Sequence, residues 1–199
     1  YEYASGAWSQ LGSDINGEAS DDYSGQAVSL SDDGTIVAIG APANDGNGTN
    51  SGHVRVYGYS SGSWSQLGAD INGEAVSNYS GTSVSLSDDG TIVAIGAPDN
   101  NGNGFEAGHV RVYEYASGSW SQLGADIDGE AAGDYSGQAV SLSDDGTTVA
   151  IGAWGNNSIA GHVRVYERAS GVGIEEANIL NLTSLNPNPN NGYFRVEID

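Results

Sequence analysis

Residues 29–42 read SLSDDGTIVAIGAP, and this stretch returns almost unchanged at residues 85–98 and again as SLSDDGTTVAIGAW at residues 141–154. Each copy has the pattern of two apolar strands joined by a tight acidic turn, in which Gly supplies the positive φ that a short hairpin needs. A connection of two or three residues forces its strands to pair antiparallel. The sequence therefore predicts a fold built from one hairpin repeated three times.

The repeated unit extends well beyond this hairpin. Trp8, Trp64 and Trp120 follow one another at intervals of 56 residues, and His53 and His109 keep the same spacing. A fixed period of this length is the mark of a repeat architecture, in which each unit buries its apolar face against its neighbours.

Each unit contains four predicted strands. Residues 27–31 alternate apolar and small side chains, residues 35–41 are continuously apolar, and residues 53–57 alternate again. Residues 8–12 form a short fourth strand, whose Trp ring is expected to pack in the core or between units. A four-stranded antiparallel meander repeated radially is a β-propeller blade. A solenoid or a sandwich is the alternative, but 56 residues are too long for one solenoid coil and a sandwich requires no repetition.

We therefore expect an all-β, propeller-type array of three four-stranded blades within residues 1–169. Counted with the Trp strand first, residues 8–167 contain three sets of four strands. Closed propellers have roughly four or more blades, and residues 1–6 match residues 113–118 in the middle of a unit. We expect the chain to begin inside a repeat and to be a fragment of a larger propeller, or else an open three-blade array.

Composition excludes several classes of partner and site. The chain has 26 acidic residues against five basic ones, a net charge of −21, which disfavours binding to nucleic acid. It has no cysteine, so disulfides and thiolate metal sites are excluded. No apolar run approaches the roughly 18 residues of a transmembrane helix, so no transmembrane segment is predicted.

The repeated motifs resemble a known family. YSGQAVS at residues 23–29, IGAP at residues 39–42 and GHVRVY at residues 52–57 are similar to the FG-GAP repeats of integrin α-subunit propellers and their bacterial relatives, and the pattern recurs at residues 79–113 and 135–166. The resemblance implies a β-propeller with an adhesion-type role outside the cell.

Blades of that family often carry a calcium loop of the form D-x-D-x-D-G between their first two strands. Residues 31–35 of this chain read SDDGT, with two adjacent carboxylates and no length to wrap six or more oxygens around an ion. The sequence departs from the family at this point, and the turn is interpreted as a solvated hairpin.

A second set of acidic residues is expected at the other edge of the blades, because alternate connections of a meander emerge on the same edge. There the loops at residues 43–48 and 99–103 should share a rim with the links at residues 14–18, 70–74 and 126–130. Such a rim could hold calcium through its oxygens, whereas the interpretation that the composition favours is that Asp, Asn and Gly simply form turns. The candidate calcium ligands are Asp14, Glu18, Asp45, Asp70, Glu74, Asp99, Asp126 and Glu130.

Histidines and unrepeated aromatic residues are the other candidates for a site. His53, His109 and His162 each follow Gly at a strand start, and because equivalent positions in successive blades lie far apart, structural or solvated histidines are predicted rather than one shared metal. Phe105 and Trp154 lie in loops and are not repeated, so they are candidates for stacking on a sugar or a protein.

The pattern of repeats stops after residue 168. Residues 170–185 are interpreted as a linker and residues 186–199 as the beginning of a further domain. LNPNPNNGYFRVEI at residues 185–198 resembles the opening of the C-terminal (type A) sorting domain recognised by the type IX secretion machinery of Bacteroidetes; the alternative is an ordinary Asn-Pro-rich linker before a strand. The resemblance rests on Asn186, Pro187, Asn188, Pro189, Gly192 and Phe194. It implies export, with release or anchoring at the cell surface.

The leading functional hypothesis is a secreted or cell-surface binding propeller that presents its acidic loop rim to a protein or glycan ligand. The chain shows no nucleophile elbow, no His-based metal motif and no unique pair of carboxylates, so it is not predicted to be an enzyme. The alternatives are an extracellular hydrolase that uses rim carboxylates, and a non-catalytic spacer beside a catalytic domain.

Overall fold

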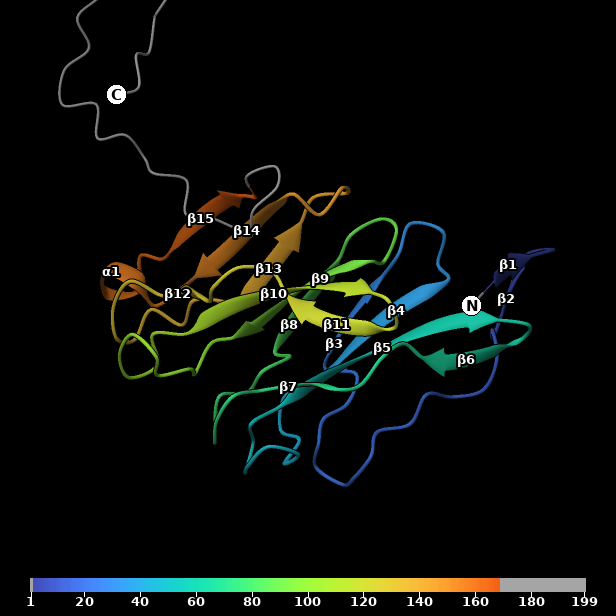
Figure 1. Cartoon of the computed structure of the whole chain (residues 1–199), viewed down its shortest axis with the longest axis horizontal. Coiled ribbons are helices and arrows are strands. Elements are labelled where there is room, and N and C mark those ends of the chain that lie inside the picture. The colour runs from blue at the N-terminus through green and yellow to red at the C-terminus, as the bar shows by residue number, and fades with distance from the viewer. Residues whose placement is uncertain (1, 169–199) are drawn as a thin grey trace, which may run out of the picture.

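The computed structural model describes residues 2–168, which form antiparallel sheets joined by turns and loops (Figure 1). The predicted linker and the sorting-signal residues, from Asn186 to Phe194, lie outside the described residues. The all-β, propeller-type architecture expected from the sequence is confirmed, since every sheet is an antiparallel meander of neighbouring strands.

The first complete blade spans residues 27–66, and its strands pair in chain order. A further short strand, two residues long, lies after the blade and pairs with the beginning of its third strand. The strands are β3 (Ala27–Leu30), β4 (Ile36–Ala41), β5 (His53–Ser60), β6 (Ser63–Gln66) and the additional β7 (Ile71–Asn72).

The second blade repeats this arrangement 56 residues later, again with an additional short strand against its third strand. Its strands are β8 (Ser83–Leu86), β9 (Ile92–Ala97), β10 (His109–Ala116), β11 (Ser119–Gln122) and the additional β12 (Ile127–Asp128).

The two ends of the array are incomplete within the described residues. The third blade has three strands there, β13 (Ala139–Leu142), β14 (Thr148–Ala153) and β15 (His162–Glu167), and the amino-terminal hairpin consists of β1 (Glu2–Ala4) and β2 (Ala7–Ser9). Trp8 lies in that hairpin and pairs with Tyr3. As predicted for the fourth strand of each unit, the Trp strand follows the third strand through a tight turn, β6 after β5 and β11 after β10.

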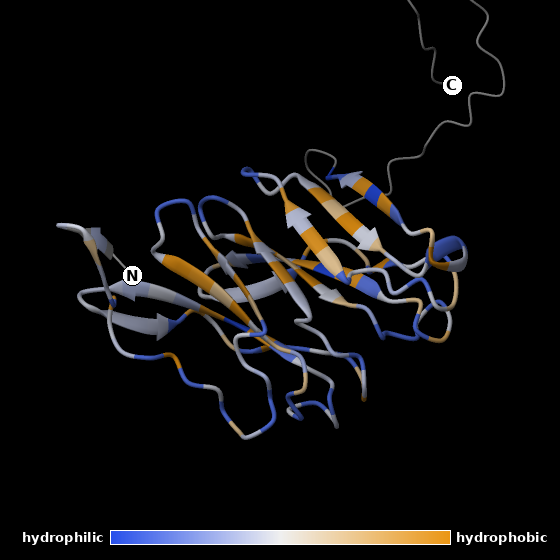
Figure 2. Cartoon of the chain, turned by 180° about the vertical axis from the view of Figure 1, so that it is seen from behind, coloured by the Kyte–Doolittle hydropathy of each residue, from blue (hydrophilic) through white to orange (hydrophobic). Residues whose placement is uncertain are grey.

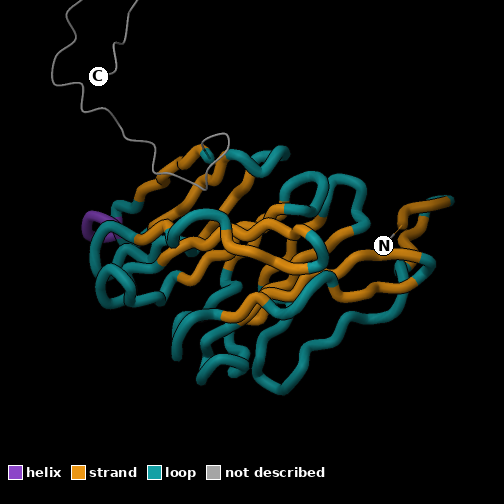
Figure 3. The backbone as a smooth tube through the Cα atoms, in the orientation of Figure 1, coloured by secondary structure: helices purple, strands orange, loops and turns teal. Residues whose placement is uncertain are grey.

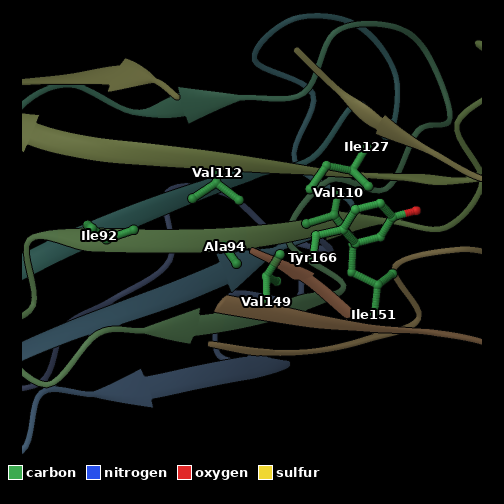
Figure 4. Close-up of a cluster of buried hydrophobic side chains, with 8 residues drawn as sticks. All are labelled: Ile92, Ala94, Val110, Val112, Ile127, Val149, Ile151 and Tyr166. Carbon is green, nitrogen blue, oxygen red and sulfur yellow. The ribbon is translucent and has the colours of Figure 1, made fainter. Parts of the chain in front are cut away.

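The apolar core lies between the blades rather than within one of them. Ile92, Ala94, Val110 and Val112 of the second blade pack against Val149, Ile151 and Tyr166 of the third (Figure 4). An equivalent cluster joins the first and second blades. Figure 2 shows the apolar residues concentrated on the strands, whose alternation gives each sheet two apolar faces.

Inter-blade hydrogen bonds hold the innermost strands side by side. The backbone N–H of Leu86 donates to Oγ of Ser29 at 2.9 Å, and that of Leu142 donates to Oγ of Ser85 at 3.0 Å. The small serine side chains therefore serve as acceptors for the next blade, which explains their alternation with apolar residues in the repeated strand.

The outer face of the third blade is apolar and uncovered within the described residues. Val163 of β15 is 67% exposed, whereas Val54, at the same position of the first blade, is fully buried against the second blade. Val28 of β3 is likewise exposed at the other end of the array. Both end faces have the chemistry of the internal interfaces and can accept a further blade of the same kind.

The Asp-Asp-Gly turn is held by its second aspartate. Oδ1 of Asp145 accepts hydrogen bonds from Oγ of Ser143, from the backbone N–H of Thr147 and from the Thr147 hydroxyl. These bonds stabilise the charged carboxylate and lower the pKa of Asp145 to about 2. The carboxylate is thus engaged in the turn itself, as it is in the two other copies.

We expect the Asp145 carboxyl to titrate near pH 2, instead of at its ordinary pKa of 3.8. Because the pKa is lower in the folded than in the unfolded chain, the stability that this group contributes is present above about pH 3.8 and is lost as pH falls through about 2. An NMR titration of the side-chain carboxyls measures the pKa of Asp145. Thr147→Val, which removes one donor, should move the pKa upward; an ordinary pKa in the unmodified chain would contradict this assignment.

Candidate functional site

The long loops and the links between blades lie at one edge of the array, as the alternation of connections predicts (Figure 3). Nδ2 of Asn47 donates to the carbonyl oxygen of Gly73 at 2.8 Å, and the N–H of Gly73 donates to the carbonyl oxygen of Gly52 at the same distance. Asn103 makes the equivalent bond to Gly129 in the next unit. We call this edge, formed by the links 13–24, 69–80 and 125–136 and the loops 43–52, 99–108 and 154–161, the rim.

A buried histidine on the rim faces two of the predicted carboxylates. Nδ1 of His53 lies 3.8 Å from Oε2 of Glu18 and 4.0 Å from Oδ2 of Asp70. Asp70 lies beside His53 because β7 pairs with the beginning of β5, which places Asn72 opposite His53. Glu18 comes from the link that precedes the blade, so the cluster joins one blade to both of its links.

The second blade contains the same cluster, and the third contains part of it. Nδ1 of His109 lies 3.8 Å from Oε2 of Glu74 and 3.5 Å from Oδ2 of Asp126. In the third blade His162 lies 3.7 Å from Glu130, and no second carboxylate joins this pair among residues 2–168. Five of the eight predicted rim carboxylates thus lie beside a histidine: two in each complete blade and one in the third blade.

The other three predicted ligands lie outside these clusters. Asp14 is exposed on its link, and Asp45 accepts a hydrogen bond from the backbone N–H of Asn50 within its own loop. Burial, and secondly the charge of Glu106, raise the pKa of Asp99. Among the described residues, the groups of three His, Asp or Glu side chains close enough to hold one metal ion therefore include none of these three acids, and the calcium rim stays a prediction.

An arginine accompanies each cluster and ties successive units together. Nη2 of Arg55 donates to the carbonyl oxygen of Asn16 at 2.8 Å, and its Nη1 lies 3.6 Å from Oε1 of Glu18. Arg111 makes the same contacts with Asn72 and Glu74. Since Asn72 also pairs with β5, the bond from Arg111 connects the second blade to the first.

Sequence reasoning missed the part that the histidine and arginine play together. In GHVRVY the two residues are separated by one position of a strand, so His53 and Arg55 lie on the same face. This alternation was the available signal, and it would have placed both side chains toward one link.

Burial keeps these imidazoles neutral near pH 7. It lowers the pKa of His109 to about 4, assisted by the positive charge of Arg111 and opposed by Asp126. Burial also lowers the pKa of His53. The histidines of the two complete blades are therefore buried and neutral rather than solvated, and their carboxylate neighbours do not form ion pairs with them at neutral pH.

Both predicted ligand-binding aromatic residues lie on loops that contact the link at Tyr135, Trp154 through its ring and Phe105 through its backbone. The Trp154 ring stacks on Tyr135, with 4.9 Å between the centroids and 11° between the planes. The Tyr135 hydroxyl hydrogen-bonds to the carboxylate of Glu106, and the carbonyl oxygen of the neighbouring Phe105 accepts a bond from Gly133 N–H. We call Phe105, Tyr135 and Trp154 the aromatic patch.

This patch is exposed and belongs to one position of the rim. Phe105 is 70% exposed and Trp154 is 48% exposed. The positions 56 residues before Phe105 and Trp154 are occupied by Thr49 and Pro98, neither of which is aromatic. A short helix, α1 (Asn156–Ile159), follows Trp154 and makes this loop different from the others.

A pocket of about 370 Å³ lies between residues 125–130 and the side chains of Arg164 and Tyr166, and no residue of the aromatic patch lines it. The equivalent space in the first blade is smaller and is closed by Trp64 of the outer strand, next to Tyr57. The larger pocket therefore marks the position of an outer strand rather than a built ligand site.

Comparison with known proteins agrees with this architecture. Residues 16–57 match the FG-GAP repeat family, and the motifs in this match recur in the two following units of the chain. No curated protein matches the sequence.

Two solved structures resemble the fold. One is from Bacteroides uniformis and was described as a proposed 6-phosphogluconolactonase, with a TM-score of 0.52, 14% identity, and coverage of 76% of this chain and 38% of the other. The other is the periplasmic gluconolactonase PpgL of Pseudomonas aeruginosa, with a TM-score of 0.50, 16% identity, and coverage of 75% and 41%. This chain spans about two fifths of their length. At such identities the likeness concerns the fold alone, a β-propeller fragment.

A membrane-spanning helix would need a long apolar segment. Within residues 2–168, no helix has the length and apolar character to cross a bilayer.

Proposed function

We propose that this chain is the binding part of a secreted or cell-surface protein, and that its rim presents the aromatic patch to an extracellular glycan or protein. The observation that carries this proposal is the exposed Trp154 ring, which stacks on the partly buried Tyr135, together with the exposed Phe105 of the neighbouring loop. Flat exposed rings on a polar rim are typical of a surface that stacks on sugar rings or on protein side chains.

The charges around the patch restrict the class of ligand that it can bind. Glu106 and Asp99 lie in the same loop, and Glu106 hydrogen-bonds to the ring hydroxyl of Tyr135. Carboxylates accept hydrogen bonds from sugar hydroxyls, whereas a net charge of −21 repels polyanions. A neutral or basic ligand, with a glycan as the first candidate, therefore fits better than an acidic polysaccharide.

Export is the second part of the proposal. The support for it is the resemblance of residues 185–198 to a type IX sorting signal, together with the FG-GAP match, a repeat typical of extracellular proteins. We propose no catalytic role, because the rim acids repeat with the scaffold and do not form one unique pair.

Truncation of the two exposed rings of the aromatic patch should weaken binding without unfolding the chain. We expect Phe105→Ala combined with Trp154→Ala to weaken binding tenfold or more, since exposed aromatic anchors commonly contribute about 2 kcal/mol each. The measurement is binding of labelled chain to an array of neutral glycans and immobilised extracellular proteins.

Trp8→Ala is the matched control, because Trp8 is also exposed but lies in the amino-terminal hairpin. Retained binding by the patch variant, or equal loss in the Trp8 variant, would rule out the patch. Turnover of an array glycan, lost in the patch variant, would favour the hydrolase alternative.

A further inference from the structure

We propose that the rim carries two binding sites for a divalent transition-metal ion of the zinc type, one in each cluster of a buried histidine and two carboxylates. The first site is Glu18, His53 and Asp70, and the second site is Glu74, His109 and Asp126.

The spacing of the donor atoms suits a metal ion better than direct hydrogen bonds. Nδ1 of His53 lies 3.8 and 4.0 Å from the two carboxylate oxygens, beyond hydrogen-bond distance. Metal–ligand bonds of about 2.0–2.2 Å in tetrahedral geometry place ligand atoms about 3.3–3.5 Å apart. All donor atoms of each site lie within 4.8 Å of one another. The side chains therefore need to close inward by only about 1 Å or less.

The two imidazoles lack another partner. Each side chain is 2% exposed, and no hydrogen bond reaches either ring of His53 or His109 from the part of the chain that the structure describes. Buried polar side chains nearly always have a partner. An ion held between Nδ1 and the two carboxylates supplies this partner, and neutral imidazole is a common metal ligand.

A second layer of contacts orients the carboxylates. Nε2 of Gln66 donates to Oδ1 of Asp70 at 2.7 Å, so the other oxygen, Oδ2, faces His53. Arg55 lies beside Oε1 of Glu18, so the other oxygen, Oε2, faces the same ring. Nδ2 of Asn44 donates to this Oε2 at 3.5 Å. Such supporting bonds are a regular feature of metal sites. Gln122 and Arg111 repeat the Gln66 and Arg55 contacts in the second site.

The donor set selects the kind of metal. One nitrogen and two carboxylate oxygens, with water completing the shell, suit zinc and its neighbours in the transition series. Calcium prefers six to eight oxygens, and a site of this composition falls short of that number. An ion here would join the links on both sides of a blade to the blade itself, and so stiffen the rim.

The third unit has an incomplete cluster and serves as an internal control. His162 keeps Glu130 as a neighbour but has no second carboxylate among residues 2–168. Asp14 is the converse case, because Gln10 holds it as Gln66 holds Asp70, yet the described residues place no histidine beside it. We therefore expect two ions per chain rather than three or four.

Calorimetric titration of the 199-residue chain with Zn²⁺ in 0.15 M NaCl tests the proposal. We expect two ions to bind with a micromolar or lower Kd, and the melting temperature to rise because only the folded state is bound. Co²⁺ in the same sites should give a visible absorption band from nitrogen and oxygen ligands. Millimolar Ca²⁺ should neither compete nor change the melting temperature. No Zn²⁺ binding at these concentrations, or displacement by Ca²⁺, would overturn the proposal.

Matched variants locate the ions. Asp70→Asn and Asp126→Asn keep the acceptor oxygen for their glutamines and should each lose one ion, and His53→Gln with His109→Gln should lose both. The control variants Asp14→Asn and His162→Gln should still bind two. Equal loss in the controls, or two ions retained by the double histidine variant with a native circular dichroism spectrum, would reveal only nonspecific binding to an acidic surface and reject the sites.

These sites are independent of the proposed ligand. None of the metal-binding residues belongs to the aromatic patch, so the Phe105 and Trp154 variants should keep both ions. Failure of one proposal therefore leaves the other intact.

Discussion

Replacing Gly40 or Gly96 by alanine should destabilise the chain by about 3 kcal/mol, because a Cβ atom at either position would enter the neighbouring blade. It would lie 2.1 Å from the carbonyl oxygen of Gly81 in the first case and 2.0 Å from that of Gly137 in the second. Both obstacles are backbone atoms, which cannot rotate away. The two glycines are therefore required by the close approach of successive blades.

Gly152→Ala is the matched control for these variants. Gly152 occupies the same place in the motif, but its Cβ would meet only Ala139 atoms, at 3.5 Å and beyond, an ordinary contact distance. We expect its urea midpoint to change little, while those of the Gly40 and Gly96 variants fall. Because the three sequences are identical here, equal effects at all three positions would contradict the stacking of blades.

Trp120→Ala is expected to cost about 3 kcal/mol, the lower end of the range for truncation of a packed aromatic residue. Nε1 of Trp120 donates to the carbonyl oxygen of Leu67 at 2.7 Å, across the boundary between units. The ring also lies 5.0 Å from the Tyr115 ring and close to Gly68, where a Cβ would come within 2.9 Å. Its removal leaves a cavity and an unpaired carbonyl at the same boundary.

Trp8→Ala should cost less than about 1 kcal/mol, because the ring is 69% exposed and little apolar surface leaves water on folding. Comparison of the two variants by chemical unfolding measures the difference. A loss of stability at Trp8 as large as at Trp120 would show that the hairpin of Trp8 is packed as the other Trp strands are.

Much of the fold could be predicted because short turns and alternation are local signals. The strands expected at residues 27–31, 35–41 and 53–57 agree closely with β3, β4 and the first part of β5. The Trp strand could be placed as the fourth strand from turn length, because a tight turn joins Ser60 to Ser63 whereas a long link follows β6.

The composition of the rim was easier to predict than its grouping. The order of connections was enough to place the link carboxylates at one edge. It did not show that Glu18 and Asp70, which are 52 residues apart in sequence and belong to different links, lie beside the same histidine. The pairing of β7 with β5 brings them together, and two residues are too short a strand to recognise from sequence. Tyr135 was missed because its partner Trp154 is not repeated.

A blocking experiment tests the central claim, that binding occurs at the rim, most directly. The chain has no cysteine, so a single introduced cysteine can carry biotin and then streptavidin at a chosen edge. Ala132→Cys places it on the rim beside the aromatic patch, and Asp144→Cys places it on the Asp-Asp-Gly turn of the same unit; both positions are exposed. We predict that streptavidin at residue 132 abolishes binding to the array component that the unmodified chain binds, and that streptavidin at residue 144 leaves it unchanged. Binding that survives the block at residue 132, or is lost equally with the block at residue 144, would contradict the account.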